Sequence, residues 1–189
     1  GAIREYRQAI RLDPADAEAP YLLGLSLRSK GDLSGAQESY LQAIQLNPSH
    51  AAAHYHLGLA LVSAGESGQA VEAFRQAIQI RPGYPDAHYQ LGLCLRSRGD
   101  LDGAVEAFQQ AISLNPGDPN APYNLGLVLK AKGDLDGAIE AYQKAVRVNP
   151  EFADAFLGLG LALKAKGDLD GAIEAYRQAL RIHPTAGAW

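Results

Sequence analysis

A proline recurs every 34 residues along this chain, and no insertion or deletion interrupts the spacing. The recurring residues are Pro14, Pro48, Pro82, Pro116, Pro150 and Pro184. In the same register every unit carries an alanine, an aromatic residue and a second alanine, and a Leu-Gly pair precedes five of these sets. A fixed period of this length is typical of repeat architectures, in which one unit cannot bury its apolar face alone and must stack on its neighbours. The sequence therefore predicts a stacked array rather than a single globular core.

Each unit has the pattern of two helices, as the third unit illustrates. Residues 87–98 place their apolar side chains three and four positions apart, which makes one helical face. Gly99 is expected to end this helix, because glycine adopts the left-handed conformation found at helix ends. We expect Asp102 to cap a second helix that runs to about Leu114, where Pro116 prevents its continuation.

These features resemble the tetratricopeptide repeat (TPR) family. The family shares a 34-residue unit with Leu-Gly in the first helix, Gly-Asp at the turn, and then small, aromatic, small and proline positions in order. The resemblance implies an all-α fold, an α-solenoid in which stacked 34-residue antiparallel helix pairs form a right-handed superhelix. It also implies that the first helices line a concave groove. One unit departs from the pattern with Gly65-Glu66-Ser67 at its turn, which we expect to be looser.

The register divides the chain into one partial and five full units. We expect a partial repeat with only its second helix, five TPR units and a short tail, with boundaries at 1–16, 17–50, 51–84, 85–118, 119–152, 153–186 and 187–189. Because the chain opens on a helical pattern and contains no methionine, we expect one continuous array cut from a longer protein. No targeting segment is visible, so the compartment stays open, with the cytoplasm as the default.

Composition excludes several classes of function. With a formal charge of −4, the chain lacks the excess of basic residues expected of a general nucleic-acid binder. The longest clean apolar run, 157–163, is far shorter than the roughly 20 residues of a membrane span, so no membrane insertion is expected. A single cysteine, Cys94, excludes an internal disulfide and any multi-cysteine metal site.

No catalytic, cofactor or metal site is predicted. His50, His54 and His56 lie close in sequence, but the helical period points the last two in directions about 200° apart. Metal ligands have to converge on one point, which these residues do not do. No serine, histidine and acid stand where an array would gather them around a pocket, and no glycine-rich phosphate loop is present.

The candidate binding surface follows the first helices. Residues three and four apart give, on one face of each helix, a leucine that follows a tyrosine in four of the five units and precedes a cation in four of the five. The central part of this row consists of Tyr55, Leu59, Tyr89, Leu93, Arg96, Tyr123, Leu127 and Lys130. Two interpretations stay open, because neighbouring first helices could cover this face by packing or a partner could cover it by binding.

The leading functional hypothesis is a non-catalytic scaffold that binds a peptide or helix of a partner protein in the groove. One alternative is the substrate-recruiting arm of a larger enzyme similar to the O-linked N-acetylglucosamine transferases. Another is self-assembly into a homo-oligomer, because the N-terminal half unit exposes apolar residues such as Ile3, Tyr6 and Ile10. The TPR adaptors that hold chaperone C-termini need asparagine where this chain has leucine, so we expect no binding of such C-terminal carboxylates.

Overall fold

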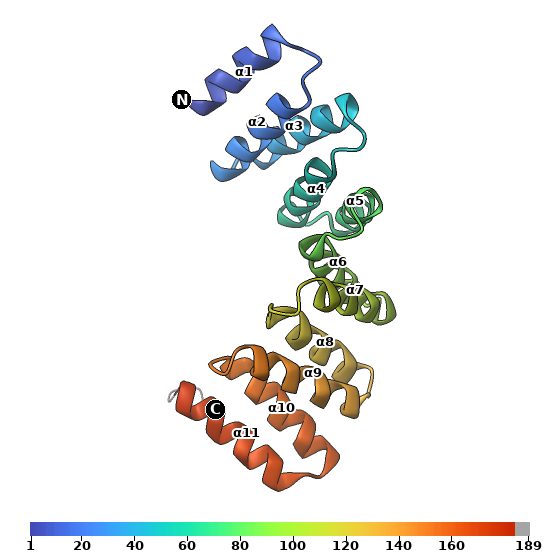
Figure 1. The fold of residues 1–189 in the computed structure, drawn as a ribbon, viewed down its shortest axis with the longest axis vertical. Coiled ribbons are helices and arrows are strands. Elements are labelled where there is room, and N and C mark those ends of the chain that lie inside the picture. The colour runs from blue at the N-terminus through green and yellow to red at the C-terminus, as the bar shows by residue number, and fades with distance from the viewer. Residues whose placement is uncertain (184–189) are drawn as a thin grey trace. The chain divides into compact units, whose positions relative to one another are not determined.

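The computed structural model describes residues 1–183, and these residues form helices and turns without any strand. The prediction of an all-α chain is confirmed, and Figure 1 shows the helices in chain order. Their bounds are α1 Ala2–Leu12, α2 Glu18–Ser29, α3 Leu33–Leu46, α4 Ala51–Ser63, α5 Ser67–Ile80, α6 Pro85–Ser97, α7 Leu101–Leu114, α8 Asn120–Ala131, α9 Leu135–Val148, α10 Ala153–Lys166 and α11 Leu169–Ile182. None of these helices is long and apolar enough to cross a membrane.

The chain forms two compact units, Gly1–Cys94 and Leu95–Trp189, which we call unit 1 and unit 2 and describe separately. Helix α1 lies in the predicted partial repeat 1–16, and each predicted 34-residue range holds two helices. The predicted tail 187–189 and the last recurring proline, Pro184, lie outside the described residues. The division into repeats at these boundaries remains our proposal.

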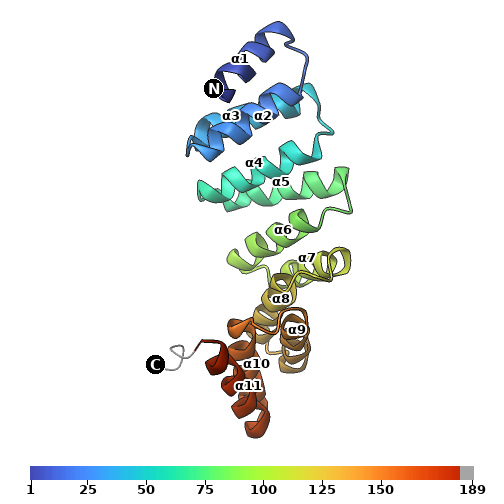
Figure 2. The same cartoon turned by 60° about the vertical axis from the view of Figure 1, so that its left-hand side comes forward.

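Helices within each unit pack in pairs. We call α2, α4, α6, α8 and α10 the first helices, and the surface along them the first-helix face. The other six are the second helices. In unit 1, α2 packs on α3 and α4 on α5, α3 adjoins α4, and α2 also touches α4 (Figure 2). In unit 2, α8 packs on α9 and α10 on α11, while α9 and α8 both contact α10.

A glycine with positive φ joins the two helices of each pair. In the third pair, Gly99 has a φ of 81° and the Asp100 carboxylate accepts a hydrogen bond from the Gly103 amide at 3.0 Å. The prediction that Asp102 caps this helix is therefore wrong, since α7 already begins at Leu101. The physical reason is that the left-handed glycine turns the chain sharply enough for the next residue to serve as the cap.

The turn with the unusual sequence keeps the same backbone but loses its cap. Gly65 has a φ of 81° and α5 begins at Ser67, as in the other units. The Glu66 side chain makes no capping hydrogen bond to the backbone. It instead accepts a hydrogen bond from the side-chain amide Nε2 of Gln69 at 2.6 Å. The substitution thus removes a hydrogen bond from the helix start without moving the helix.

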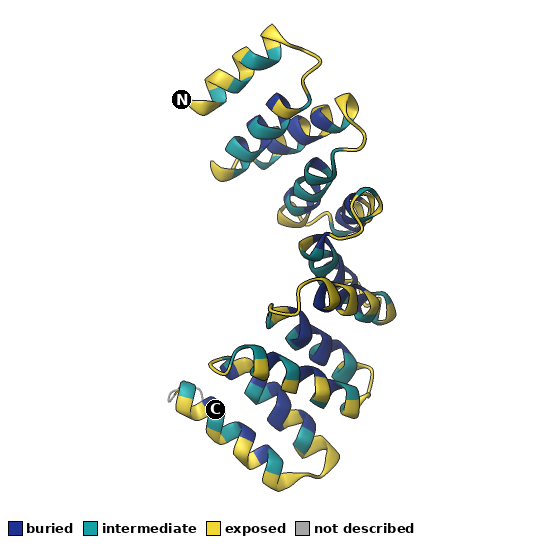
Figure 3. Ribbon diagram, in the orientation of Figure 1, coloured by how far each residue is buried: buried dark blue, intermediate teal, exposed yellow. Residues whose placement is uncertain are grey.

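The core lies between the helices and is built from aromatic rings facing small residues. Tyr40, Phe74, Phe108 and Tyr142 are fully buried. A β-carbon placed on Gly58 would stand 2.6 Å from the Phe74 ring, so α4 approaches α5 at a distance that only glycine allows. Figure 3 shows buried residues on each described helix except α1, which has none.

Candidate functional site

Unit 1 supplies half of the predicted binding residues. Tyr55 and Leu59 come from α4, and Tyr89 and Leu93 come from α6. All four side chains are half-buried. Each therefore packs against its neighbours with part of its surface and leaves the rest accessible to a ligand.

Tyr55 illustrates the packing part. Its ring centroid lies 4.8 Å from that of Tyr84 and 5.8 Å from that of Phe74. The Arg81 guanidinium lies 3.3 Å from the centroid of Tyr84 and holds that ring in turn. Burial, followed by the charge of Asp86, raises the pKa of Tyr55 to about 12. The phenol is therefore neutral and acts as an apolar anchor with a polar tip.

Unit 2 supplies the other half, Arg96, Tyr123, Leu127 and Lys130, and these side chains are also half-buried. The Tyr123 ring lies 4.9 Å from Phe152 and 6.0 Å from Tyr142, and burial together with Asp154 raises the pKa of this tyrosine. Tyr123 and Leu127 pack on a core cluster that includes Tyr142, Leu159 and Ala162.

A terminal position shows how much of the row neighbouring helices cover. Leu161 on α10 occupies the register of Leu59 and Leu127, and it is 48% exposed whereas those two are half-buried. Helix α10 has no later first helix beside it in the described chain. We infer that a following first helix covers part of each leucine and leaves the remainder on the surface.

A recurring ring contact was not predicted from the sequence. Tyrosines of the first helices pack at a tilt against the residue that precedes the next first helix. The pairs are Tyr21 with His50 at 4.7 Å, Tyr55 with Tyr84 at 4.8 Å and Tyr123 with Phe152 at 4.9 Å. The sequence could have indicated this contact, because positions 50, 84 and 152 share one register and all carry aromatic rings.

A second missed feature is an aromatic cluster at Arg28 in unit 1. The Tyr21 ring lies 4.7 Å from His50, 5.7 Å from His56 and 6.2 Å from Tyr40. Burial, then the positive charge of Arg28, lowers the pKa of His56 to about 4, so this ring is neutral at pH 7. The cluster thus holds one cation among neutral rings.

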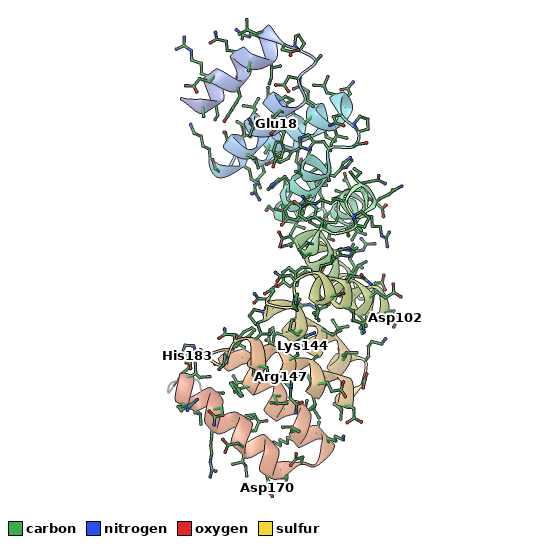
Figure 4. All side chains as sticks on the ribbon, in the orientation of Figure 1. Glu18, Asp102, Lys144, Arg147, Asp170 and His183 are labelled. Atoms are coloured by element: carbon green, nitrogen blue, oxygen red, sulfur yellow. The ribbon has the colours of Figure 1, made fainter. Side chains whose placement is uncertain are left out.

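The carboxylate of Glu18, near this cluster, already accepts a hydrogen bond from His50. The His50 ring accepts a hydrogen bond from the Ala53 amide at Nδ1, which leaves the proton on Nε2. Nε2 then donates to the Glu18 carboxylate at 3.3 Å, and Figure 4 labels Glu18 on α2. This bond directs Glu18 to the histidine.

The remaining histidines have structural contacts. His54 and His88 occupy one register, and their Nε2 atoms donate to the carbonyls of Pro48 at 3.1 Å and Pro82 at 3.0 Å. Within residues 1–183, no three histidine, cysteine or acidic side chains gather as metal ligands would. Cys94 is buried.

Clefts that the sequence did not indicate border the second helices, including a basic one of about 540 Å³ on α1 lined by Arg4, Arg7 and Arg11. Two others, one in each unit, lie between a first and a second helix. The cleft of unit 1, about 450 Å³, includes Leu23, Asp32 and Glu38 in its lining. The cleft of unit 2, about 520 Å³, includes the equivalent Leu125, Asp134 and Glu140 together with the basic Lys144 and Arg147, both labelled in Figure 4. Acidic and basic side chains mix there, so neither cleft favours a ligand of one charge.

Comparison with known proteins places the fold. The sequence profile described as tetratricopeptide repeat matches residues 1–36, 21–85, 60–119 and 123–187. No curated protein matches the chain. The crystal structure of MamA is 30% identical in sequence with a TM-score of 0.83, and the match covers 88% of this chain and 98% of that one.

Two further structures extend the comparison. YrrB is described as a TPR protein with an unusual peptide-binding site. It is 28% identical with a TM-score of 0.86, and the match covers 96% of this chain and 93% of that one. Pseudomonas aeruginosa pilF, at 22% identity and a TM-score of 0.78 over 96% of this chain and 82% of that one, shows the fold alone. The fold class is an α-solenoid. Because the profile covers nearly all of the sequence and the 34-residue register recurs without a gap, the chain belongs to the tetratricopeptide repeat family.

Proposed function

We propose that this chain is a non-catalytic scaffold that binds a peptide or helix of a partner protein along its first-helix face. The observation that carries the proposal is the row of half-buried tyrosines and leucines on that face in each unit. Relatives support it, because YrrB, at 28% identity, is described as having a peptide-binding site.

The chemistry of the row suits a peptide ligand. Tyrosine and leucine side chains that are already held by their neighbours lose little conformational entropy when a ligand covers them. They supply apolar anchors of the kind that dominate protein interfaces. The cations Arg96 and Lys130 at the end of the row in unit 2 would set orientation and association rate more than affinity.

Selection from a displayed library of random peptides tests the proposal. Peptides are selected on the whole chain, and their binding is then measured on Leu59→Asp in unit 1 and Leu127→Asp in unit 2. Matched controls place the same charge on exposed positions of second helices, Gln79→Asp and Gln110→Asp. Helicity and thermal unfolding of each variant establish that it remains folded.

We expect at least one leucine variant to stay folded and to lose peptide binding, while both controls bind normally. If folded leucine variants keep full affinity and the second-helix variants lose it, the ligand uses the other side of the helix pairs and the proposal is wrong. The proposal is also wrong if the selection yields no peptide whose binding depends on Leu59 or Leu127.

Self-assembly is the second candidate, and one observation favours it. Helix α1 has no buried residue, and its apolar Ile3, Tyr6 and Ile10 stay half-exposed. Against this, Glu5 occupies the register of small buried residues such as Ala73 and Ala141, so a helix packed over α1 would have to desolvate a carboxylate. Light scattering over a range of concentrations measures the outcome. The recruiting-arm alternative gains no support from residues 1–183.

A further inference from the structure

Arg28 stands at the meeting point of three helices in unit 1. It lies in the last turn of α2 and is half-buried. Its positive charge acts on Tyr40 of α3 and on Tyr55 and His56 of α4. Arg28 also occupies the register of Arg96 and Lys130, so it belongs to the same row on the first-helix face.

This guanidinium has no carboxylate partner in the described chain. The ion pairs among residues 1–183 are His50 with Glu18, Arg75 with Glu72, Lys132 with Asp102 and Lys166 with Asp136. None includes Arg28. The guanidinium lies beside the Tyr40 hydroxyl, and this hydroxyl and Nδ1 of His56 are buried without a hydrogen bond of standard geometry among the described residues. A half-buried guanidinium without a carboxylate partner is a group that an anionic acceptor would stabilise.

Arg96 provides an internal comparison, because it occupies the same register two repeats later. Its guanidinium donates a hydrogen bond to Oδ1 of Asn124 on the next first helix. The residue that corresponds to Asn124 beside Arg28 is His56, a neutral ring that makes no such bond. The chain thus gives Arg96 an amide oxygen as acceptor, whereas the polar group beside Arg28 is the Tyr40 hydroxyl, a weaker acceptor than a carboxylate.

The surroundings of Arg28 select the kind of anion. The single positive charge of Arg28 among neutral rings neutralises one negative charge. A phosphate dianion would need a second cation for neutralisation. The rings also exclude water in part, and this strengthens a single ion pair. A guanidinium matches the two oxygens of a carboxylate in a planar, two-pronged geometry.

We propose that Arg28 binds the carboxylate of an aspartate or glutamate side chain in a partner peptide held on the first-helix face of unit 1. This inference rests on the proposed function and adds the residue that the ligand must carry. It concerns a side chain within the peptide and not a terminal carboxylate, for which the asparagine positions are missing.

The same selection of random peptides tests the inference. Peptides that depend on Leu59 are sequenced, and the frequency of aspartate and glutamate at each aligned position is compared with the starting library. The selection is repeated on Arg28→Gln and on the matched control Lys30→Gln, which removes a neighbouring but exposed positive charge at the C-terminal end of the same helix, α2. Arg28→Lys, which keeps the charge but not the two-pronged geometry, serves as a second variant in case Arg28→Gln fails to fold.

We expect one acidic position to be enriched on the native chain and on Lys30→Gln but not on Arg28→Gln. The affinity of a selected acidic peptide should fall about tenfold or more on Arg28→Gln and by a smaller factor on Arg28→Lys. The peptide is synthesised with a free and with an amidated C-terminus. Equal affinity of the two forms assigns the carboxylate to the side chain, whereas a requirement for the free C-terminus overturns the assignment.

The outcomes separate this inference from the function on which it rests. If peptides depend on Leu59 but show no acidic enrichment, or if Arg28→Gln and Lys30→Gln behave alike, the inference about Arg28 fails and peptide binding on the first-helix face stands. If no peptide depends on the leucines of either unit, both fail.

Discussion

At the scale of the residue, the closest helix contacts depend on glycines that face aromatic rings. Gly58 is buried in the middle of α4, where alanine would be the better helix former by about 1 kcal/mol. A β-carbon there would meet the Phe74 ring at 2.6 Å, and Phe74 is itself fully buried and cannot move aside freely. Packing should therefore outweigh helix propensity at this position.

Gly58→Ala should lower the free energy of unfolding by about 1 to 3 kcal/mol, as overpacking in a core does. The matched control is Gly83→Ala, because nothing lies within 4 Å of a β-carbon at Gly83 and its φ is not positive. That control should be neutral or slightly stabilising. Urea unfolding measures both changes, and equal effects would mean that the contact with Phe74 is not tight.

At the scale of the element, the start of each second helix depends on one carboxylate at a fixed distance from the backbone. The side chains of Asp32, Asp134 and Asp168 accept hydrogen bonds from amides three residues later at 2.9 Å. Glu66 stands in the same position with the same backbone turn, but its extra methylene carries the carboxylate to Gln69 instead. Helix α5 is therefore the described second helix of a full pair that begins without a side-chain cap.

Glu66→Asp should restore the cap and raise the free energy of unfolding by about 0.5 to 1 kcal/mol. The reverse change, Asp134→Glu, should lower it by a similar amount in unit 2, because the Gly137 amide would lose its acceptor. Urea unfolding of the two variants provides the comparison. A change of the same sign in both would show that side-chain length does not control the cap.

The sequence predicted the helix pairs because they follow from a period that every unit repeats. It could not predict that Arg96 donates to an amide oxygen of the next first helix while Arg28 lies beside the Tyr40 hydroxyl. That difference depends on Asn124 and His56, which lie 28 residues further along and meet the arginines only after neighbouring first helices have packed. The cap at Asp100 was missed for a related reason, because the conformation of the preceding glycine decides which acid begins the helix.

At the scale of the whole molecule, the two units differ in how they should respond to acid. Unit 1 contains four of the five histidines, and the only histidine described in unit 2 is His183. Among them His56 stands out, because burial and the charge of Arg28 lower its pKa from an ordinary value of 6.5 to about 4. The unfolded chain therefore binds a proton at this site at a higher pH than the folded chain does.

The sign of the acid effect follows from that difference. A group whose pKa is lower in the folded state favours folding when it is neutral in both states, so its stabilisation is complete above pH 6.5 and is lost as the pH falls toward 4. Urea unfolding followed residue by residue by NMR at pH 7 and pH 5 should show the midpoint of α3 and α4 falling more than that of α9 and α10. His56→Gln should remove this difference, because Gln90 occupies the same register in the next repeat and glutamine does not titrate. If both units shift equally, or if the difference persists in His56→Gln, another group in unit 1 carries the proton, and burial of His56 does not control the acid response.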